Sequence, residues 1–500
     1  MNTIDQIQSF QGKYPKQLWY LFFSEMWERF CFYGMRGMLT YFMVTQLFMD
    51  EKAANLQYGA TQAWVYAFTF IGGLFADKIL GFRKSLFWGG LLMITGSIIL
   101  AIDPKQYFFL GIAFNVVGTG FFKPNISSMV GQLYKQGDSR RDDGFSLFYA
   151  GINMGALLGG YFCISIGKGE FLSGAIPSEL SWNVAFGLAA LVMTISLITF
   201  TRTQKELGPI GLSPIQSAKD KSWVWQDIAV YIGGILAIPA IVIMVANTEY
   251  TDYFMYAIGP FSLMYLAFEM SKGTVAEAKK LIAALFFIFF SIVFWAIFEQ
   301  AGGSLSIYAA NHLSSEFLGF VHLDPNGVNN SANSAFVIAF AALAGTIWVW
   351  LAKRNKEPNT VVKFGIGFLF LGLGYMLFYS GRFFADAQGV SSLDMFTFAY
   401  FAVTLGELCL SPIGLSIMTK LAPERLQGFM MGMWFLASAY GQYVAGLFGA
   451  SISPNPEASP IEKLNIYTQG YHDFAWYAII AGVLLILISP MIRKLMQDVK

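Results

Sequence analysis

Charged residues are scarce in this 500-residue sequence, and their scarcity excludes most classes of soluble protein. Only 13% of the residues are charged, whereas Asp, Glu, Lys and Arg make up about a quarter of a typical soluble domain. The net charge is only +1, and the basic residues form no long stripe of the kind that binds a phosphate backbone. We therefore expect no nucleic-acid partner.

Cysteine and histidine are also rare. The three cysteines, Cys31, Cys163 and Cys409, lie in apolar segments, which argues against a disulfide framework. No cleavable signal peptide is visible, because the N-terminus is polar and the first apolar run contains charged residues. The sequence shows no nucleophile–base set and no metal-ligand spacing. We expect neither an enzyme nor a cofactor.

Long apolar runs are what the sequence does contain. Hydrophobic residues make up 56% of the chain, with 49 Phe and 50 Gly, and the mean hydropathy is +0.53. Several runs, such as 85–102, 228–245 and 281–298, approach the roughly 20 residues that cross a bilayer as a helix. Lipid offers no partner for an open backbone group, so such segments must be helical. The predicted fold class is an all-α, polytopic membrane protein.

We predict fourteen membrane-spanning helices. They cover residues 17–46, 56–79, 84–102, 106–133, 143–166, 182–201, 224–246, 252–270, 280–310, 332–352, 362–380, 395–421, 425–451 and 473–493. Basic residues favour cytoplasmic loops, and here they alternate consistently. The loops on one side contain only Lys52, Lys105, Lys168, Arg382 and Lys463. We therefore predict an even number of spans, with both termini in the cytoplasm.

The predicted spans divide into three parts. A polar linker over 203–222 follows the first six spans, and the next two spans are short and nearly uncharged, so we interpret them as a peripheral hairpin. Removing them leaves six plus six helices, the repeat arrangement of the major facilitator fold. We expect an N-terminal six-helix bundle over 1–202, a linker and hairpin over 203–272, and a C-terminal six-helix bundle over 273–500.

The first predicted span carries four ionisable side chains on one helical face. Glu25, Glu28, Arg29 and Arg36 recur at steps of three, four and seven residues. Charges inside a membrane are costly and persist where they are paired or line a water-filled cavity. A static ion-pair cluster that locks helices is the plain alternative, but a lock would not need so many charges.

Three more charged residues lie beside helix-weakening residues. Lys123 precedes Pro124, Glu299 precedes a Gly-Gly pair, and Glu407 precedes a proline. Proline and glycine pairs bend helices, so we expect bends that carry a ligand-binding or titratable group. In the alternative, Lys123 snorkels to a surface, and hydrogen bonds to a neighbouring helix neutralise each carboxylate.

The carboxylates are the candidate proton carriers. The three histidines lie in or beside outer loops, and the predicted spans contain more acidic than basic interior groups. A buried carboxyl without a cationic partner is the natural carrier of a proton. Removing Glu25, Glu28, Glu299 and Glu407 one at a time, with measurement of proton flux, tests this hypothesis.

Two further stretches carry functional residue types. The Gly-rich segment 72–84, with Asp77 and Arg83, joins spans two and three on the basic side. It is similar to the loop of major facilitator transporters in which the acid latches the cytoplasmic side, although an ordinary turn is the alternative. Asn153 lies in an apolar helix among small residues, where it either binds a ligand or bridges helices.

Four ordered motifs resemble the proton-dependent oligopeptide transporter family. The run 25–34 is similar to the family signature ExxERFxYYG, and the segments 72–84, 118–125 and 148–155 follow in the family's order. The surroundings of Glu299, Glu407 and Trp434 extend the resemblance over nearly the whole chain. Fourteen spans with an inserted hairpin is the pattern of bacterial members. Phe32 replaces the usual first tyrosine, so a hydroxyl that would bond the peptide backbone is missing.

The resemblance implies roles for individual residues. The peptide carboxylate is bound by Arg36 and Lys123. The peptide ammonium is bound by Glu407 with Asn153 and Asn333, and Ser411 also belongs to the binding residues. The side-chain pockets are lined by Tyr33, Tyr66, Trp295 and Trp434. Proton binding is coupled to gating by Glu25, Glu28, Arg29 and Glu299, and the gating loop contains Asp77 and Arg83.

The function that the resemblance implies is proton-coupled symport of di- and tripeptides into the cell by alternating access. Its partners are the peptide, protons and the lipid of a bacterial inner membrane, and its energy source is the proton gradient. One charge crossing 100 mV supplies about 2.3 kcal/mol, enough for more than tenfold accumulation. A transporter of another small solute (a drug, a sugar or an anion) is the alternative, and a receptor that binds without flux is a more distant one.

Overall fold

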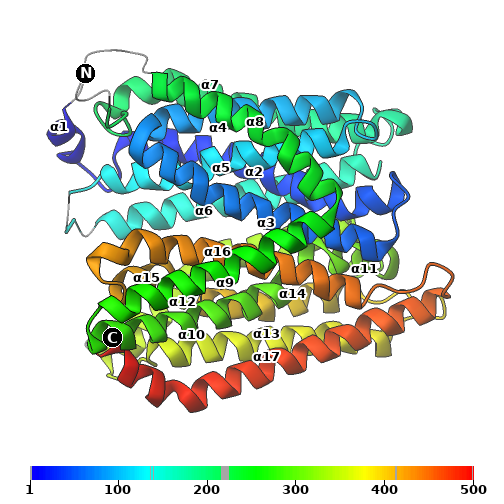
Figure 1. The fold of residues 1–500 in the computed structure, drawn as a ribbon. Helices are drawn as coiled ribbons and strands as arrows, with labels where there is room; N and C mark the ends of the chain where they lie inside the picture. The colour runs from blue at the N-terminus through cyan, green and yellow to red at the C-terminus, as the bar shows by residue number, and fades with distance from the viewer. Residues whose placement is uncertain are drawn as a thin grey trace. The chain divides into compact units, whose positions relative to one another are not determined.

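We describe the protein from a computed structural model (Figure 1), over residues 3–135, 137–138, 140–215, 225–410, 414–497 and 499. These residues are almost entirely helical, which confirms the predicted all-α class. Their one sheet is a two-stranded antiparallel ladder of β1 (Glu316–Phe317) and β2 (Val321–His322). By length and composition, nine helical stretches of the described residues qualify as membrane spans, and two of these contain more than one helix. The number fourteen stays a prediction.

The helices follow one another with short connections. The first group is α1 (Ile4–Gln8), α2 (Lys16–Thr45), α3 (Glu51–Phe75), the π-helical turn η1 (Ala76–Leu80), α4 (Gly81–Ile102), α5 (Phe108–Gln132), α6 (Arg140–Gly167), η2 (Ser178–Leu180), α7 (Ser181–Thr203) and η3 (Gln204–Leu207). The second group is α8 (Trp225–Ala246), α9 (Thr248–Lys272), α10 (Val275–Phe298), η4 (Glu299–Gly302), α11 (Ser304–His312), α12 (Pro325–Lys353), α13 (Thr360–Ser380) and η5 (Gly381–Phe384). The last is α14 (Leu393–Leu410), α15 (Gly414–Leu421), η6 (Glu424–Leu426), α16 (Gln427–Ser451) and α17 (Pro460–Met496).

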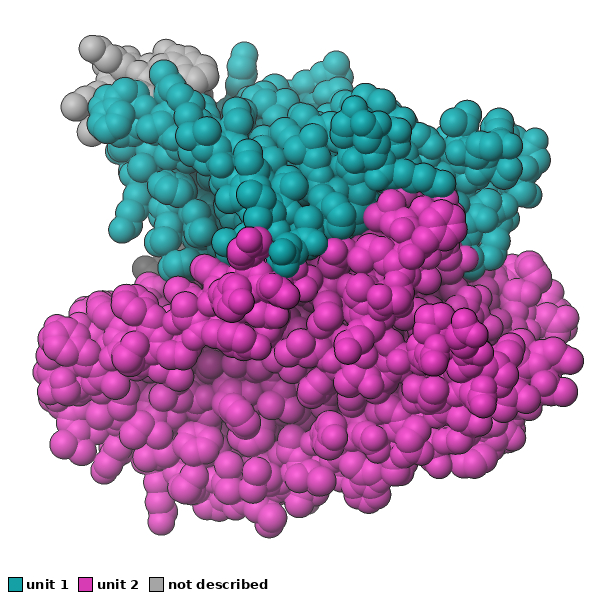
Figure 2. Space-filling view, turned by 45° about the vertical axis from the view of Figure 1, so that its right-hand side comes forward, with its two compact units in different colours: residues 1–39, 64–247 teal, residues 40–63, 248–500 magenta. Residues whose placement is uncertain are grey.

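The chain forms two compact units (Figure 2). Unit 1 contains Met1–Leu39 and Trp64–Asn247, and unit 2 contains Thr40–Ala63 and Thr248–Lys500. The segment that we expected to form a separate hairpin is divided between them, since α8 belongs to unit 1 and α9 to unit 2. The ends of α2 and α3 that meet at Thr40–Ala63 likewise belong to unit 2.

Polar contacts explain this assignment of the two inserted helices. In unit 1, Asp227 at the start of α8 is fully buried and forms an ion pair with Lys84 of α4. In unit 2, Asp252 of α9 accepts a 2.6 Å hydrogen bond from the Tyr443 hydroxyl of α16. Buried pairs of this kind anchor a helix because breaking one leaves an unpaired charge or dipole in an apolar surrounding.

A glycine stripe packs α6 against the charged helix α2 in unit 1. A Cβ added at Gly155 would lie 2.1 Å from the Met26 carbonyl oxygen, and one at Gly159 would lie 2.2 Å from that of Phe30. No side chain fits there, so the two backbones touch, as small residues allow in membrane helices. This contact brings the helix of Asn153 alongside the ionisable face of α2.

The predicted gating segment folds as the tight turn η1, followed by α4. Gly81 has a φ of +72°, a left-handed conformation that glycine adopts most easily. Arg83 is buried and donates hydrogen bonds to the carbonyl oxygens of Ile210 (2.7 Å) and Gly208 (2.6 Å), so it binds the start of the linker. Asp77 is exposed and has no hydrogen bond or ion pair within the part of the chain that the structure describes. Its latch role stays a prediction.

The bend expected beside Glu299 is confirmed. Helix α10 ends at Phe298, a single 3-10 turn covers Glu299–Gly302, and α11 starts at Ser304 after Gly303, whose φ of −105° and ψ of −114° are not helical. Helix α14 ends at Leu410 and α15 starts at Gly414. The proline at 412 and Ser411 lie outside the described residues. Helix α5 continues through Pro124 from Phe108 to Gln132.

Two helices begin much earlier than predicted. Helix α12 starts at Pro325 rather than at 332, because Asp324 caps it by accepting from the backbone N–H groups of Asn326 (3.2 Å) and Gly327 (3.1 Å). Helix α17 starts at Pro460 rather than at 473, with Ser459 in a capping box. Both starts are polar, and a search for apolar runs does not detect them.

The segment Thr40–Ala63 packs closely within unit 2. A Cβ added at Gly59 of α3 would lie 2.7 Å from the Cα of Gly446 of α16, so these two backbones are in contact. The Thr40 hydroxyl donates a 2.5 Å hydrogen bond to the Gly302 carbonyl oxygen, at the break between α10 and α11. Tyr467 of α17 donates to Glu51 at the start of α3.

Candidate functional site

The charged face of α2 contains one arginine shared by two glutamates. The Arg29 Nε atom lies 3.0 Å from Glu25 Oε1 and 2.5 Å from Glu28 Oε2. All three residues are at least 97% buried. Glu25 Oε2, Glu28 Oε1 and Arg29 Nη2 have no hydrogen-bond partner among the described residues. One guanidinium therefore faces two carboxyl groups that retain free acceptor positions, an arrangement that favours uptake of one proton.

An aromatic ring separates this arginine from Lys123 of α5. The Phe32 ring centre lies 5.5 Å from the Arg29 guanidinium and 5.6 Å from Lys123 Nζ. Lys123 Nζ also lies 4.2 Å from the ring centre of Tyr66 of α3. Aromatic faces attract cations at such distances. The structure thus brings Lys123 and Tyr66 together, and it places Phe32 between two cations.

Farther along α2, the side chains are more accessible. Tyr33 and Arg36 are half-buried, with the Arg36 guanidinium 5.7 Å from the Tyr33 ring centre. Asn153 of α6 is 6% exposed, and its Nδ2 donates a 2.9 Å hydrogen bond to the Tyr149 carbonyl oxygen of its own helix. That bond does not bridge two helices, so a ligand-binding role for Asn153 stays a prediction.

In unit 2, Asn333 and Glu407 are direct partners. Asn333 Nδ2 of α12 donates to Glu407 Oε2 of α14 at 2.7 Å and to Thr404 Oγ1 at 3.1 Å. Both Asn333 and Glu407 are half-buried. The amide holds one carboxylate oxygen in place, and such a carboxylate suits an ammonium ligand.

A second layer of hydrogen bonds connects this pair to the break in α10. Tyr400 of α14 donates to Asn329 Oδ1 of α12 at 2.6 Å, and Asn329 Nδ2 donates to the Ala301 carbonyl oxygen at 2.8 Å. Ala301 belongs to the same 3-10 turn as Glu299, which is 4% exposed. The turn is also held by Gln300 Nε2, which donates to the Ala445 carbonyl oxygen of α16 at 2.9 Å. The η4 turn, which carries Glu299, and helix α14, which carries Glu407, are therefore both hydrogen-bonded to Asn329 of α12.

The two predicted tryptophans of unit 2 pack at helix contacts. Trp295 of α10 lies against Gly441 of α16, where an added Cβ would be 2.7 Å from the Trp295 Cβ atom. Trp434 is 8% exposed and covers Gly414, the first residue of α15. Ser411 lies outside the described residues.

The sequence did not predict that Phe32 contacts Arg29 and Lys123. It also did not predict the hydrogen-bonding residues on the helices of Asn333 and Glu407, which are Thr404, Asn329 and Tyr400. Polar residues at 329, 333, 400, 404 and 407 recur at three- and four-residue steps on their helices, and that signal was available in the sequence. Within the described residues, no group of three or more His, Cys, Asp or Glu is suited to a metal ion. Unit 1 thus carries a cationic, aromatic group, and unit 2 carries a carboxylate–amide group.

Comparison with known proteins gives consistent relatives. The model of the POT family matches residues 83–463. The chain is 33% identical to an uncharacterised transporter, YclF, of Bacillus subtilis, with 97% of this chain and 96% of that one covered. It is 32% identical to the peptide transporter YePEPT of Yersinia enterocolitica, again over 97% and 96%. It is 30% identical to a di-/tripeptide transporter of Lactococcus lactis, with 97% of this chain and 97% of that one covered. 

Solved structures give the same answer. A peptide transporter, POT, in complex with alafosfalin superposes with a TM-score of 0.80 at 32% identity, with 100% of both chains covered. The same transporter in complex with sulfate gives the same TM-score, identity and coverage. The fold of this chain is therefore the major facilitator fold of these transporters, which confirms the predicted architecture.

Proposed function

This chain belongs to the POT family, and from that premise we propose that it imports di- and tripeptides into a bacterial cell together with protons. Its relatives in Yersinia and Lactococcus are named as peptide and di-/tripeptide transporters. The observation that carries the proposal is the pair of oppositely charged groups, Lys123 among aromatic rings and Glu407 held by Asn333. A short peptide is a zwitterion, and these groups match its two ends.

The peptide ends would be bound by different residues. Lys123 and Arg36 would bind the carboxylate, since ammonium and guanidinium groups donate charge-assisted hydrogen bonds to carboxylates. Glu407 would bind the peptide ammonium, because a carboxylate forms charge-assisted hydrogen bonds with an ammonium group. Tyr33, Tyr66, Trp295 and Trp434 would contact side chains of varied shape, as aromatic surfaces do with little specificity. Asn153 and Ser411 remain proposed contacts.

The α2 cluster would carry the proton. Arg29 neutralises one of its two glutamates, so the second carboxyl is the group that gains and loses a proton most readily. Protonation of Glu28 or Glu25 would release part of the pull on Arg29 and change its position relative to Phe32. Glu299 would respond in unit 2, where it sits in the break between α10 and α11. These changes would couple the proton to the movement of helices.

We place the protein in the inner membrane with both termini in the cytoplasm, following the distribution of basic loop residues. Its surroundings would be membrane lipid. We propose no chemical step, no cofactor and no nucleic-acid partner, because movement of a peptide down the combined gradient requires none.

The test is uptake of a labelled dipeptide into liposomes under an imposed inward proton gradient. We expect accumulation with the wild type, and loss of most of it in Glu407→Gln, whose neutral amide attracts an ammonium weakly. Glu457→Gln, an exposed position between α16 and α17, is the matched control and should accumulate as the wild type does. Gradient-independent or absent accumulation by the wild type would remove the proposed function.

A further inference from the structure

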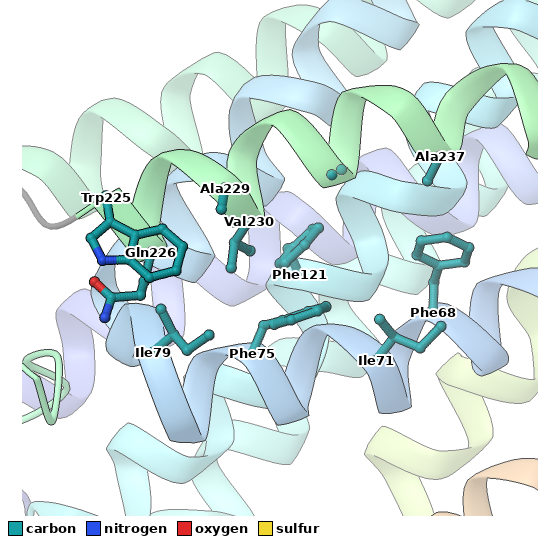
Figure 3. A pocket seen from close by; sticks show the side chains of 12 residues that line it. Phe68, Ile71, Phe75, Ile79, Phe121, Trp225, Gln226, Ala229, Val230 and Ala237 are labelled. Atoms are coloured by element: carbon teal, nitrogen blue, oxygen red, sulfur yellow. The ribbon is translucent and has the colours of Figure 1, made fainter.

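An apolar groove lies between α3, α5 and α8 in unit 1, away from the candidate site (Figure 3). Its volume is about 450 Å³, within the roughly 300–1,000 Å³ range of small-molecule sites. Phe68 and Phe75 of α3, Phe121 of α5 and Val230 of α8 form much of its wall. An unfilled groove of this size would leave these side chains without contacts on one side.

One end of the groove is polar. Figure 3 shows Trp225 and Gln226 at the end near Ile79, while Phe68 and Ala237 lie at the other end. The Gln226 Oε1 atom is buried and has no hydrogen-bond partner among the described residues. An amide oxygen only accepts hydrogen bonds, so it requires a donor from a bound molecule. The Trp225 side chain is 73% exposed, as expected for an indole at a membrane interface.

The charges at this end nearly balance, and the remaining basic group, Arg83, is bonded to the linker carbonyl oxygens of Ile210 and Gly208. Asp77 and Lys78 precede Ile79 in the chain, and the ion pair of Lys84 with Asp227 lies beside Gln226 in sequence. An anionic headgroup is usually met by a surplus of basic residues, which the described residues do not provide here. A headgroup of zero net charge that carries N–H donors fits both the balanced charges and the unpaired oxygen.

We propose that this groove binds one acyl chain of a phosphatidylethanolamine molecule, with the headgroup at Gln226. Two of the helices that form the groove, α3 and α8, belong to segments long and apolar enough to span a membrane, where acyl chains are the abundant apolar molecules. The ammonium of the headgroup donates to Gln226 Oε1, and the chain covers Phe75, Val230 and Phe121.

The bound lipid would stabilise Lys123 and Tyr66 from the opposite sides of their helices, α5 and α3. Phe68 follows Tyr66 by two residues on α3, and Phe121 precedes Lys123 by two on α5, so each pair points to different sides of its helix. The two helices cross at Gly120, where an added Cβ would lie 2.6 Å from the Phe68 carbonyl oxygen. An occupied groove therefore holds the crossing that positions Lys123 against Tyr66. This consequence for peptide binding rests on the proposed function, whereas the lipid site itself does not.

Filling the groove with a side chain tests the site. Gly233 lines the groove, and a Cβ built there has no atom within 4 Å, so Gly233→Leu occupies the space without a clash. Gly345→Leu on α12 is the matched control, because Gly345 also has open space around it and does not line the groove. Ala237→Leu, at the other end of the groove, is a second variant in case the first does not fold.

The readout is photolabelling by phosphatidylethanolamine that carries a diazirine in its acyl chain. The full-length protein is reconstituted in nanodiscs, and after digestion the labelled fragments of the protein are mapped by mass spectrometry. We expect label on α3, α5 or α8, reduced about fivefold or more by Gly233→Leu, which removes space for the chain, and unchanged by Gly345→Leu. Label spread evenly over all lipid-facing helices, or unchanged by both Gly233→Leu and Ala237→Leu, would overturn the site.

The headgroup is tested by competition. Unlabelled phosphatidylethanolamine should displace the probe better than phosphatidylcholine, whose quaternary ammonium has no N–H donor, and Gln226→Leu should abolish that preference. Equal competition by both lipids in the wild type would overturn the headgroup assignment. Because labelling needs no peptide flux, a failure of the lipid site is distinguishable from a failure of the proposed transport.

Discussion

The contacts of Phe32 with two cations require an aromatic side chain but no hydroxyl group. At this position the family signature usually has tyrosine, yet the ring still lies between Arg29 and Lys123 at cation–π distances. Phenylalanine and tyrosine present the same aromatic face, so the attraction of the ring to the two cations does not depend on a hydroxyl. What phenylalanine removes is only a hydrogen-bonding group toward the ligand.

The role of Lys123 can be tested with a modified substrate. We expect Lys123→Ala to weaken binding of a dipeptide about tenfold or more, because a charge-assisted hydrogen bond contributes roughly 1.5–3 kcal/mol. The wild type should discriminate strongly against the same dipeptide with a C-terminal amide, and the variant should not. Competition for uptake measures both. Lys105→Ala, at an exposed position between α4 and α5, is the control and should discriminate as the wild type does. If Lys123→Ala still discriminated against the amidated dipeptide, the assignment of Lys123 would be contradicted.

The shared arginine leads to a separate expectation for Glu28. In Glu28→Gln, Arg29 keeps its 3.0 Å contact with Glu25, and the cluster loses the surplus carboxyl that would carry a proton. Gradient-driven accumulation should therefore fall to background, while exchange of labelled for unlabelled peptide, which needs no net proton movement, continues. Glu179→Gln, exposed in η2, serves as control. A Glu28→Gln variant that still accumulates peptide in proportion to the pH gradient would show that the proton travels elsewhere.

At the scale of helices, close backbone contacts depend on glycine. The contact of Gly59 in α3 with Gly446 in α16 leaves no room for a side chain. The break before α11 has the opposite effect, since it interrupts the helix beside Glu299. Rigid contacts and interrupted helices alternate within unit 2, which is what a structure that moves between discrete states requires.

Gly59→Leu should loosen the packing of α3 on α16. Its Cβ would lie 2.7 Å from the Gly446 Cα atom, and overpacking of this kind costs about 1–3 kcal/mol. We expect a lower thermal midpoint in detergent. Gly428→Leu on the same α16, where nothing lies within 4 Å of an added Cβ, should unfold at the wild-type temperature. Equal midpoints for the two variants would refute the contact.

At the scale of the whole molecule, the inserted helices are parts of the two units. Helix α8 is anchored to unit 1 by Asp227, and α9 to unit 2 by Asp252 and by Glu269, which pairs with Arg425 at 2.5 Å. Each helix thereby enlarges one unit. The groove beside α8 exists only because that helix is held on α4 and α5.

The orientation of the chain can be tested with single cysteines. The native cysteines of the described chain are buried, so an introduced thiol reports its own side. In intact cells, a membrane-impermeant maleimide should label Glu457→Cys but not Lys356→Cys, although both positions are exposed. Lys356→Cys should react only after permeabilisation. The reverse pattern would place the termini outside.

The amino-acid sequence by itself determined the helical class, because apolar runs long enough to cross a membrane must satisfy their backbone groups internally. It also proposed the residues of the candidate site, because charges inside a membrane persist where they are paired or line a water-filled cavity. It did not reveal the capped starts at Pro325 and Pro460, which depend on single side chains and lie outside apolar runs. Only the tertiary structure decided which side chains meet, such as Asn333 with Glu407 or Phe32 with Lys123. Those contacts join residues on different helices, and helix packing, rather than local pattern, sets their distances.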